Sequence, residues 1–136
     1  MSNNSGNVRT LLLVDDDQDD QEFFKLALAE IKEPVCCITA DNGQEALDQL
    51  AMHMYYPDLI FLDMNMPLMN GFKFLERIKD IDHLKHIPVI VYSTSNEPGE
   101  ISNAKSMGAI DYITKPTKLA DLCKLLISVL DKRMKP

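Results

Sequence analysis

An acidic residue, Asp63, directly follows the apolar run 59–62. Four consecutive apolar residues are typical of a strand that is buried on both faces of a parallel sheet. Because ligands and chemistry in open α/β sheets gather beyond the carboxyl ends of the strands, Asp63 is a candidate functional residue. Taken alone, this carboxylate could instead cap the following loop or helix.

Polar residues follow three other apolar runs in the same way: Asp15 with Asp16, Ser93, and Lys115. If the strands are parallel, all of these residues lie on the same edge of the sheet as Asp63. Each of them alone is most simply a loop residue or a helix cap. Together they form a candidate site, because they would converge on one crevice.

Three carboxylates in one crevice, those of Asp15, Asp16 and Asp63, would repel one another by a few kcal/mol unless a cation or a proton intervenes. A divalent hard cation removes this repulsion. Mg²⁺ suits the site because it accepts one or two carboxylates, a carbonyl oxygen and several waters, and Mn²⁺ could substitute for it. Calcium is disfavoured, because it needs more oxygen ligands and the acidic run lacks the spacing of a calcium-binding loop.

The same residues could carry out phosphoryl transfer. A carboxylate such as Asp63 is a nucleophile that forms an aspartyl phosphate. The oxygens of the transferring group need stabilisation, which the Lys115 ammonium, the Ser93 hydroxyl and Mg²⁺ would supply.

The elements that must position these residues alternate along the chain. Apolar runs predict strands at 8–14, 35–40, 59–62, 87–92 and 111–114, and apolar residues at three- and four-residue spacing predict helices at 21–31, 45–54, 71–79, 98–107 and 119–134. Five strands alternating with five helices indicate an α/β protein with one doubly wound parallel sheet.

Length and charge exclude several classes of protein. The 136 residues correspond to one domain, expected over 8–134 and preceded by a flexible polar tail at 1–7. A net charge of −7 argues against nucleic acid or an anionic membrane surface as the main partner. The sequence has neither a bilayer-length apolar run nor a signal peptide, so we expect a cytoplasmic protein.

The cysteines and histidines do not suggest chemistry of their own. The three cysteines, Cys36, Cys37 and Cys123, lie in apolar patterns and are expected to be reduced, buried packing residues. The three histidines, His53, His83 and His86, have no metal-type spacing and are expected near helix ends and loops.

Four motifs in order resemble the receiver domains of two-component response regulators: Leu-Val-Asp-Asp at 13–16, Leu-Asp-Met-Asn-Met-Pro at 62–67 with Asn-Gly at 70–71, Ser93, and Lys-Pro at 115–116. The resemblance covers about residues 10–133. It implies a five-stranded sheet of flavodoxin-like order 2-1-3-4-5. It also implies that Asp63 is the phosphoacceptor and that Asp15 and Asp16 bind Mg²⁺.

Further roles follow from the same resemblance. The backbone carbonyl of Asn65 would complete the metal site, Lys115 would pair with the phosphoryl group, Ser93 would be the switch hydroxyl, and Tyr112 would change rotamer on activation. Thr94, which adjoins Ser93, leaves open which hydroxyl is the switch. Thr117 stands where receivers commonly carry an aromatic or aliphatic residue, which bears on output and not on the chemistry.

The resemblance implies a signalling domain and not an enzyme with its own substrate. A histidine kinase or histidine phosphotransfer protein would supply the phosphoryl group, and we expect no output domain because the last helix ends close to Pro136. The signal would then pass by contact with another protein, from a monomer or a phosphorylation-dependent homodimer.

Two rival functions are an aspartate-nucleophile phosphatase of the haloacid dehalogenase type and a flavodoxin-like binding module. The first needs a later acidic pair, and the second needs a phosphate loop where this chain has five acids.

Overall fold

The computed structural model describes residues 9–66 and 69–133. The predicted tail at 1–7, Pro67 of the central motif and Met134 of the last predicted helix lie outside these residues. The described elements are the strands β2 (Arg9–Val14), β3 (Val35–Ala40), β4 (Leu59–Leu62), β5 (Val89–Ser93) and β6 (Asp111–Thr114), and the helices α1 (Gln18–Ile31), α2 (Gly43–Ala51), α3 (Gly71–Lys79), α4 (Pro98–Ser106) and α5 (Leu119–Arg133).

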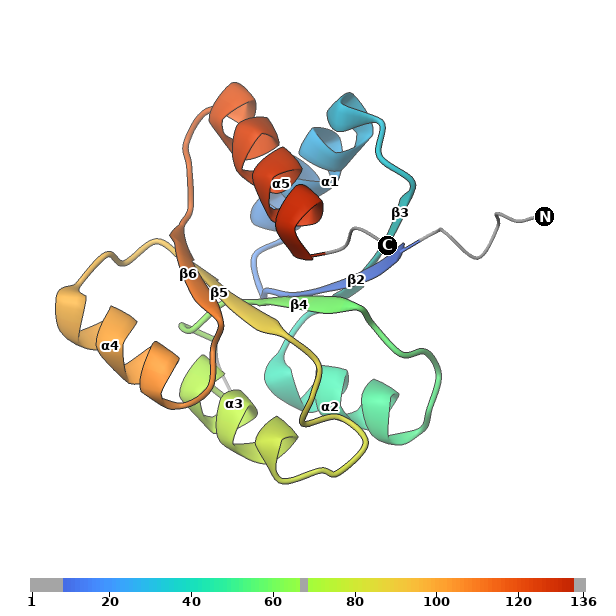
Figure 1. Cartoon of the computed structure of the whole chain (residues 1–136), viewed down its shortest axis with the longest axis vertical. Helices are drawn as coiled ribbons and strands as arrows, with labels where there is room; N and C mark the ends of the chain where they lie inside the picture. The colour runs from blue at the N-terminus through green and yellow to red at the C-terminus, as the bar shows by residue number, and fades with distance from the viewer. Residues whose placement is uncertain (1–8, 67–68, 134–136) are drawn as a thin grey trace.

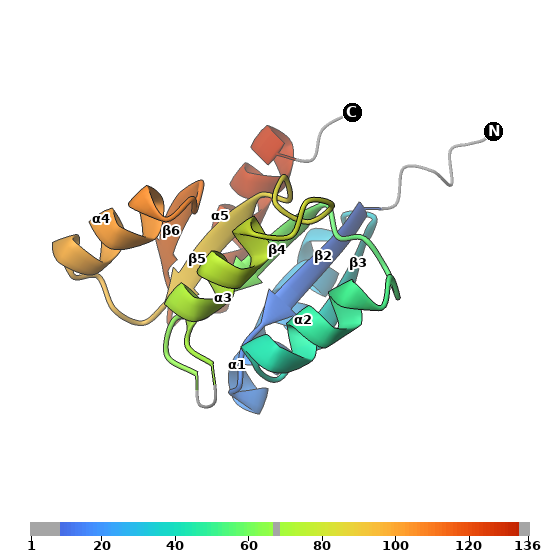
Figure 2. The same cartoon turned by 90° about the horizontal axis from the view of Figure 1, so that it is seen from below.

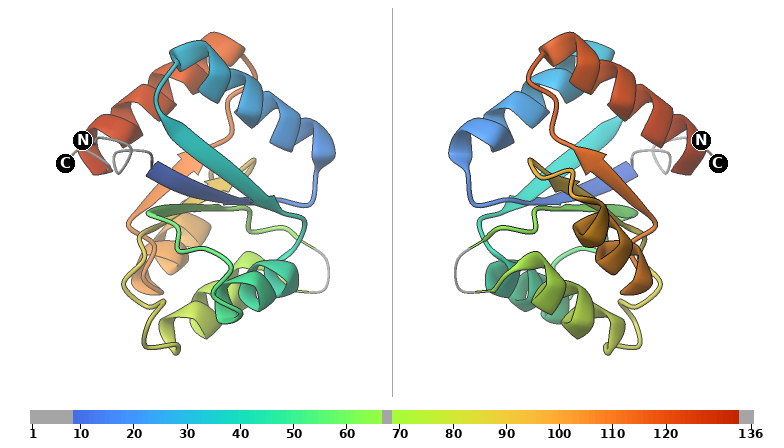
Figure 3. Two further views of the ribbon diagram at one scale, coloured as in Figure 1. Left: turned by 90° about the vertical axis from the view of Figure 1, so that its right-hand side faces the viewer. Right: turned by 90° about the vertical axis from the view of Figure 1, so that its left-hand side faces the viewer.

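The five strands form one parallel sheet in the order β3-β2-β4-β5-β6. Counted along the chain, this is the predicted order 2-1-3-4-5. Helices α1 and α5 cover one face of the sheet, and α2, α3 and α4 cover the other (Figures 1 and 3). The α/β fold with one doubly wound sheet is therefore confirmed.

Strand β2 shows why the central strands are apolar throughout. Its residues Leu11 and Leu13 belong to the core cluster beneath α1 and α5, and Leu12 and Val14 belong to the cluster on the opposite face. All four side chains are fully buried. Because both faces of the sheet are covered by helices, polar residues are confined to the strand ends.

Side-chain caps make two helices begin earlier than their apolar spacing predicts. Asp17 accepts a hydrogen bond from the Asp20 amide at 3.1 Å, so α1 begins at Gln18 and not at residue 21. Asn42 caps α2 in the same way, so this helix begins at Gly43 and not at residue 45. The apolar pattern identifies the buried face of a helix but does not identify the polar residues of its first turn.

Two predictions about packing are wrong. Helix α2 ends at Ala51, His53 adopts a left-handed φ of 55°, and Met54 is therefore 64% exposed instead of lying on the apolar face of the helix. The second error concerns Cys36, which is exposed, whereas Cys37 and Cys123 are partly buried and pack against the core cluster beneath α1 and α5, and all three cysteines are free as predicted. Cys36 lies on β3, an edge strand with a neighbour on one side only, so its side chain is less covered than those of the central strands.

Candidate functional site

The parallel register brings the predicted strand ends together. The Asp63 amide donates to the Val14 carbonyl at 2.9 Å, which fixes the end of β4 beside the end of β2. Similarly, the amide of Lys115, which follows β6, donates to the carbonyl of Ser93 at the end of β5 at 2.7 Å. The carboxyl ends of the strands therefore open on one edge, beside the start of α1 (Figure 2).

Lys115 is at the centre of this edge. Its ammonium nitrogen Nζ lies 2.9 Å from Asp15 Oδ2, 2.7 Å from Asp20 Oδ2 and 3.5 Å from Asp63 Oδ2. The Lys115 side chain is 8% exposed. Burial alone would lower the pKa of Lys115, but Asp20 and Asp15 raise it above its usual value, so the group stays charged.

Asp15 is fully buried, with one oxygen satisfied and one not. Its Oδ1 accepts a hydrogen bond from the Asp17 amide at 2.9 Å. Its Oδ2 has no hydrogen-bond partner among the described residues and forms an ion pair with Lys115 Nζ at 2.9 Å. Burial, with a smaller contribution from Asp63, raises the pKa of Asp15 to about 6 despite the nearby lysine.

Asp63 has a similar environment. Its Oδ1 accepts a hydrogen bond from the Asn65 amide at 3.2 Å, and its side chain is 8% exposed. Burial raises the pKa of Asp63, and the Lys115 ammonium and the Asn65 amide oppose that shift. This carboxylate is thus held in place by two donors while part of it remains accessible.

Three carboxylates at this edge fit a divalent cation. Asp15, Asp16 and Asp63 each offer an oxygen, and these oxygens lie within 4.8 Å of one another. Burial raises the pKa values of Asp15 and Asp63, and Asp15 Oδ2 has no hydrogen-bond partner among the described residues, so a bound cation would offset the cost of holding these carboxylates charged. The donor set is all oxygen, which suits Mg²⁺ or Mn²⁺. The Asn65 carbonyl as a further ligand stays a prediction.

The two candidate switch hydroxyls lie in different surroundings. Ser93 is fully buried, and its Oγ accepts a long hydrogen bond of 3.4 Å from the Ser95 amide. Thr94 is exposed and lines a hollow of about 370 Å³ together with Lys115 and Asp20. The role of Ser93 as the switch hydroxyl stays a prediction.

Tyr112 is tied to the loop that follows β5. It pairs with Val91 across the sheet, and its hydroxyl lies 2.8 Å from the Ser95 carbonyl and 3.0 Å from Glu100 Oε1 of α4. Burial raises the pKa of Tyr112, so the hydroxyl is protonated and can donate to one of these oxygens at a time. The aromatic side chain therefore connects β6 to the segment that begins just after Ser93.

Two site residues were missed by the sequence analysis. Asp20 makes the 2.7 Å ion pair with Lys115, and buried Gln21 donates to the Asp15 carbonyl at 2.7 Å and to Asp41 Oδ1 at 2.9 Å. The acidic run contained the signal for Asp20, because a helix that begins at Gln18 places its first turn beside the end of β2. The positions of Asp20 and Gln21 both depend on α1 beginning at Gln18, and the apolar pattern does not show that start.

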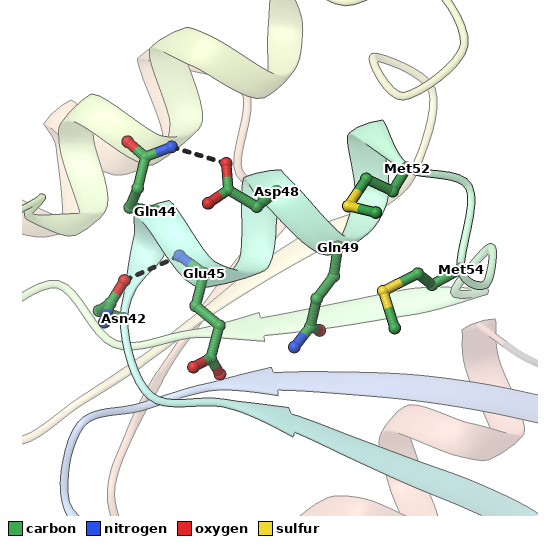
Figure 4. Close-up of a pocket in the computed structure, with 7 residues that line it drawn as sticks. All are labelled: Asn42, Gln44, Glu45, Asp48, Gln49, Met52 and Met54. Carbon is green, nitrogen blue, oxygen red and sulfur yellow. Dashed lines mark hydrogen bonds between the residues drawn. The ribbon is translucent and has the colours of Figure 1, made fainter.

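A second hollow, of about 400 Å³, lies along α2 and contains none of the site residues. Polar side chains of α2 line it together with the exposed residues Met52 and Met54 (Figure 4). It is therefore separate from the carboxylate cluster.

Residues 11–127 match the family model described as the response regulator receiver domain. The chain belongs to this family. The receiver domain is similar in structure to the phosphorylated cyanobacterial phytochrome response regulator RcpA, with a TM-score of 0.85, 31% identity, and coverage of 93% of this chain and 94% of that one. It is also similar to the Mn²⁺-bound form of response regulator Rcp1, with a TM-score of 0.82, 27% identity, and coverage of 93% and 95%.

A relative in sequence is a probable cyclic di-GMP phosphodiesterase of Vibrio cholerae, which is 37% identical over 114 residues. The match covers 81% of this chain and 24% of the phosphodiesterase, so the receiver domain spans about a quarter of that relative's length. Among the described residues, no helix combines the length and apolar character needed to cross a bilayer.

Proposed function

We propose that this receiver domain accepts a phosphoryl group on Asp63 from a phosphohistidine of a histidine kinase or histidine phosphotransfer protein. The observation that carries the proposal is the contact of Lys115 with both Asp63 and Asp15 at one edge of the sheet. A buried ammonium beside a partly accessible carboxylate stabilises the charge that phosphoryl transfer brings to that carboxylate.

The transfer exchanges one bond to phosphorus for another. An Asp63 oxygen forms a bond to phosphorus while the bond from phosphorus to the histidine nitrogen breaks, and the imidazole, protonated on its other nitrogen, leaves as a neutral ring. Lys115 neutralises part of the charge on the transferred group. Asp15, Asp16 and Asp63 would hold Mg²⁺, which when bound offsets the negative charge of carboxylates and phosphoryl oxygens.

We propose that the phosphoryl group is read through Ser93 and Tyr112. Phosphorylation adds negative charge at Asp63 and draws hydrogen-bond donors toward it. Ser93 ends the strand next to β4, and the loop that follows it carries the Ser95 carbonyl to which Tyr112 is bound. A shift of that loop would change the surface formed by α4, β6 and α5, where a downstream protein would bind.

The proposed output is contact with another protein. Support comes from Tyr112, whose hydroxyl contacts the Ser95 carbonyl and Glu100 of α4 and so connects the loop after β5 to the surface formed by α4, β6 and α5. We propose a cytoplasmic location because phosphohistidine donors of this kind act on soluble receivers. The receiver would be a monomer or a phosphorylation-dependent homodimer.

The test is phosphoryl uptake from acetyl phosphate, followed by intact-protein mass spectrometry. Wild-type protein with Mg²⁺ should gain one phosphoryl group, and Asp63→Asn should gain none. Asp82→Asn, which removes a carboxylate that is 98% exposed, is the matched control and should behave as wild type. Undiminished uptake by Asp63→Asn would show that another residue is the acceptor, and uptake that persists in a chelator would exclude Mg²⁺ dependence.

A further inference from the structure

Asp20 makes the shortest ion pair of Lys115, yet it belongs to none of the motifs that identify the site. Its Oδ2 lies 2.7 Å from Lys115 Nζ in a hydrogen-bonded contact, compared with 2.9 Å for Asp15 and 3.5 Å for Asp63. Charge-assisted contacts of this length are the strong ones. Lys115 is therefore shared between Asp20 and the carboxylates that form the candidate metal site.

Helix α1 fixes the position of Asp20. The Asp20 amide donates to the side chain of the N-cap residue Asp17 at 3.1 Å, which places Asp20 in the first turn. Its side chain is 35% exposed, whereas those of Asp15 and Asp63 are 0% and 8% exposed. Asp20 and Lys115 both line the hollow of about 370 Å³, so Asp20 is the most exposed of the carboxylates that contact the ammonium.

The ammonium and a divalent cation compete for the same oxygens. Any contact that Lys115 makes with Asp15 or Asp63 places a positive charge where the cation would bind and occupies an oxygen lone pair. A carboxylate on the outer side offers the ammonium a partner that is not a metal ligand. Asp20 is such a partner, and it lowers the free-energy cost of separating the ammonium from the oxygens of Asp15 and Asp63.

We propose that Asp20 is a positioning residue: it holds the Lys115 ammonium by its shortest contact and so weakens the attraction of that ammonium to the oxygens of Asp15 and Asp63, which a divalent cation can then bind. This inference rests on the proposed function, because it assumes that the carboxylates bind a metal. In the held position Lys115 is close enough to Asp63 to contact a phosphoryl oxygen without leaving Asp20. Asp20 thus acts through Lys115 and not by ligating the metal.

The test is titration of the protein with Mg²⁺ or Mn²⁺ alone, followed by calorimetry, with no phosphodonor present. Asp20→Asn keeps the shape of the side chain and removes its charge, so Asp15 and Asp63 remain as the charged partners of Lys115 and metal affinity should fall about tenfold. Asp19→Asn is the matched control, since Asp19 is exposed on the preceding position of α1 and has no ion pair with Lys115. The metal affinity of Asp19→Asn should stay within about twofold of the wild-type value, because an exposed charge is screened.

Two further variants separate positioning from a general effect of charge. Asp20→Glu keeps a carboxylate on a flexible stem and should restore most of the wild-type affinity. In a Lys115→Met background the ammonium is gone, so adding Asp20→Asn should change metal affinity by less than about twofold. A tenfold loss that persists without Lys115 would mean that Asp20 acts on the cation directly, and the inference would be wrong.

The outcome distinguishes the inference from the proposed function. Wild-type protein that binds neither cation would overturn the metal site itself. Wild-type protein that binds the cations, together with equal affinities for Asp20→Asn and Asp19→Asn, would overturn only the role of Asp20. Circular dichroism of each variant checks that the fold is retained, as expected for a residue that is one-third exposed.

Discussion

At the scale of a single residue, Asp15 shows that the site lowers the stability of the fold. It is a buried carboxylate with an oxygen that makes no hydrogen bond, and burial raises its pKa from the ordinary 3.8 to about 6. The folded protein therefore holds a proton on Asp15 at pH values where the unfolded chain has lost it. The stability contributed by this proton is present below about pH 4 and is lost as pH rises through about 6.

We predict that Asp15→Asn stabilises the metal-free protein above pH 6. Asn keeps the acceptor for the Asp17 amide and removes the buried charge, and Lys115 retains Asp20 and Asp63 as partners. The gain at pH 8 should be a few kcal/mol and should shrink toward pH 4. Denaturant unfolding in a chelator at several pH values measures it. A variant less stable than wild type at pH 8 would contradict this account of Asp15.

The residues that the sequence predicts best are those at strand ends. Asp15, Asp63 and Lys115 were predicted to meet because parallel strands bring their carboxyl ends to one edge, and the structure places them in contact through Lys115. Asp20 could not be predicted in the same way. Its contact depends on where α1 begins and on how its first turn is directed, and the apolar spacing reports neither.

At the scale of the elements, the connection from β4 to α3 requires a glycine. A Cβ built on Gly71 would lie 2.7 Å from the Met64 Cα and 2.9 Å from the Asp63 carbonyl oxygen, both of them backbone atoms that cannot easily move. The Gly71 amide also donates to the Met64 carbonyl at 3.1 Å. The start of α3 is therefore packed directly against the chain that carries Asp63.

We predict that Gly71→Ala destabilises the fold by about 1–3 kcal/mol, because overpacking forces the backbone beside Asp63 to shift. Gly99→Ala is the matched control, since a Cβ at Gly99 in α4 meets nothing within 4 Å. That control should be neutral or stabilising by up to about 1 kcal/mol, because alanine favours the helix. Chemical unfolding of both variants measures the difference, and equal effects would contradict the close approach at Gly71.

Element boundaries were the weaker part of the sequence analysis for a physical reason. The 3.6-residue pattern marks which residues are buried, but Asp17 and Asn42 start their helices with polar side chains that lie outside it. The pattern also continued α2 to Met54, whereas the helix stops at Ala51. Strand type was easier, because continuous apolar runs indicate burial on both faces of a sheet, whereas the strand order followed only from the resemblance to receiver domains.

At the scale of the whole molecule, charge and metal binding are linked to stability. The chain carries a net charge of −7, and a cluster of its carboxylates lies at one edge of the sheet. A ligand that binds only the folded state stabilises it by mass action. A divalent cation in that cluster would therefore stabilise the entire domain, and not only the loops around it.

We predict that Mg²⁺ at one hundred times its dissociation constant raises the melting temperature by on the order of 5–10 °C, because such binding contributes about 2.7 kcal/mol. The control is NaCl at the same ionic strength, which screens the net charge without entering the site. Differential scanning calorimetry compares the two. Equal shifts in Mg²⁺ and NaCl would mean that the cation acts only by screening.

The central claim is that Asp63 is the residue that carries the phosphoryl group. The direct measurement is chemical mapping: wild-type protein is phosphorylated with acetyl phosphate and Mg²⁺, reduced with borohydride, which converts an aspartyl phosphate to homoserine, and digested for peptide mass spectrometry. We predict homoserine at position 63 and at no other acid of the cluster. Homoserine at Asp15, Asp16 or Asp20, with Asp63 unchanged, would contradict the account.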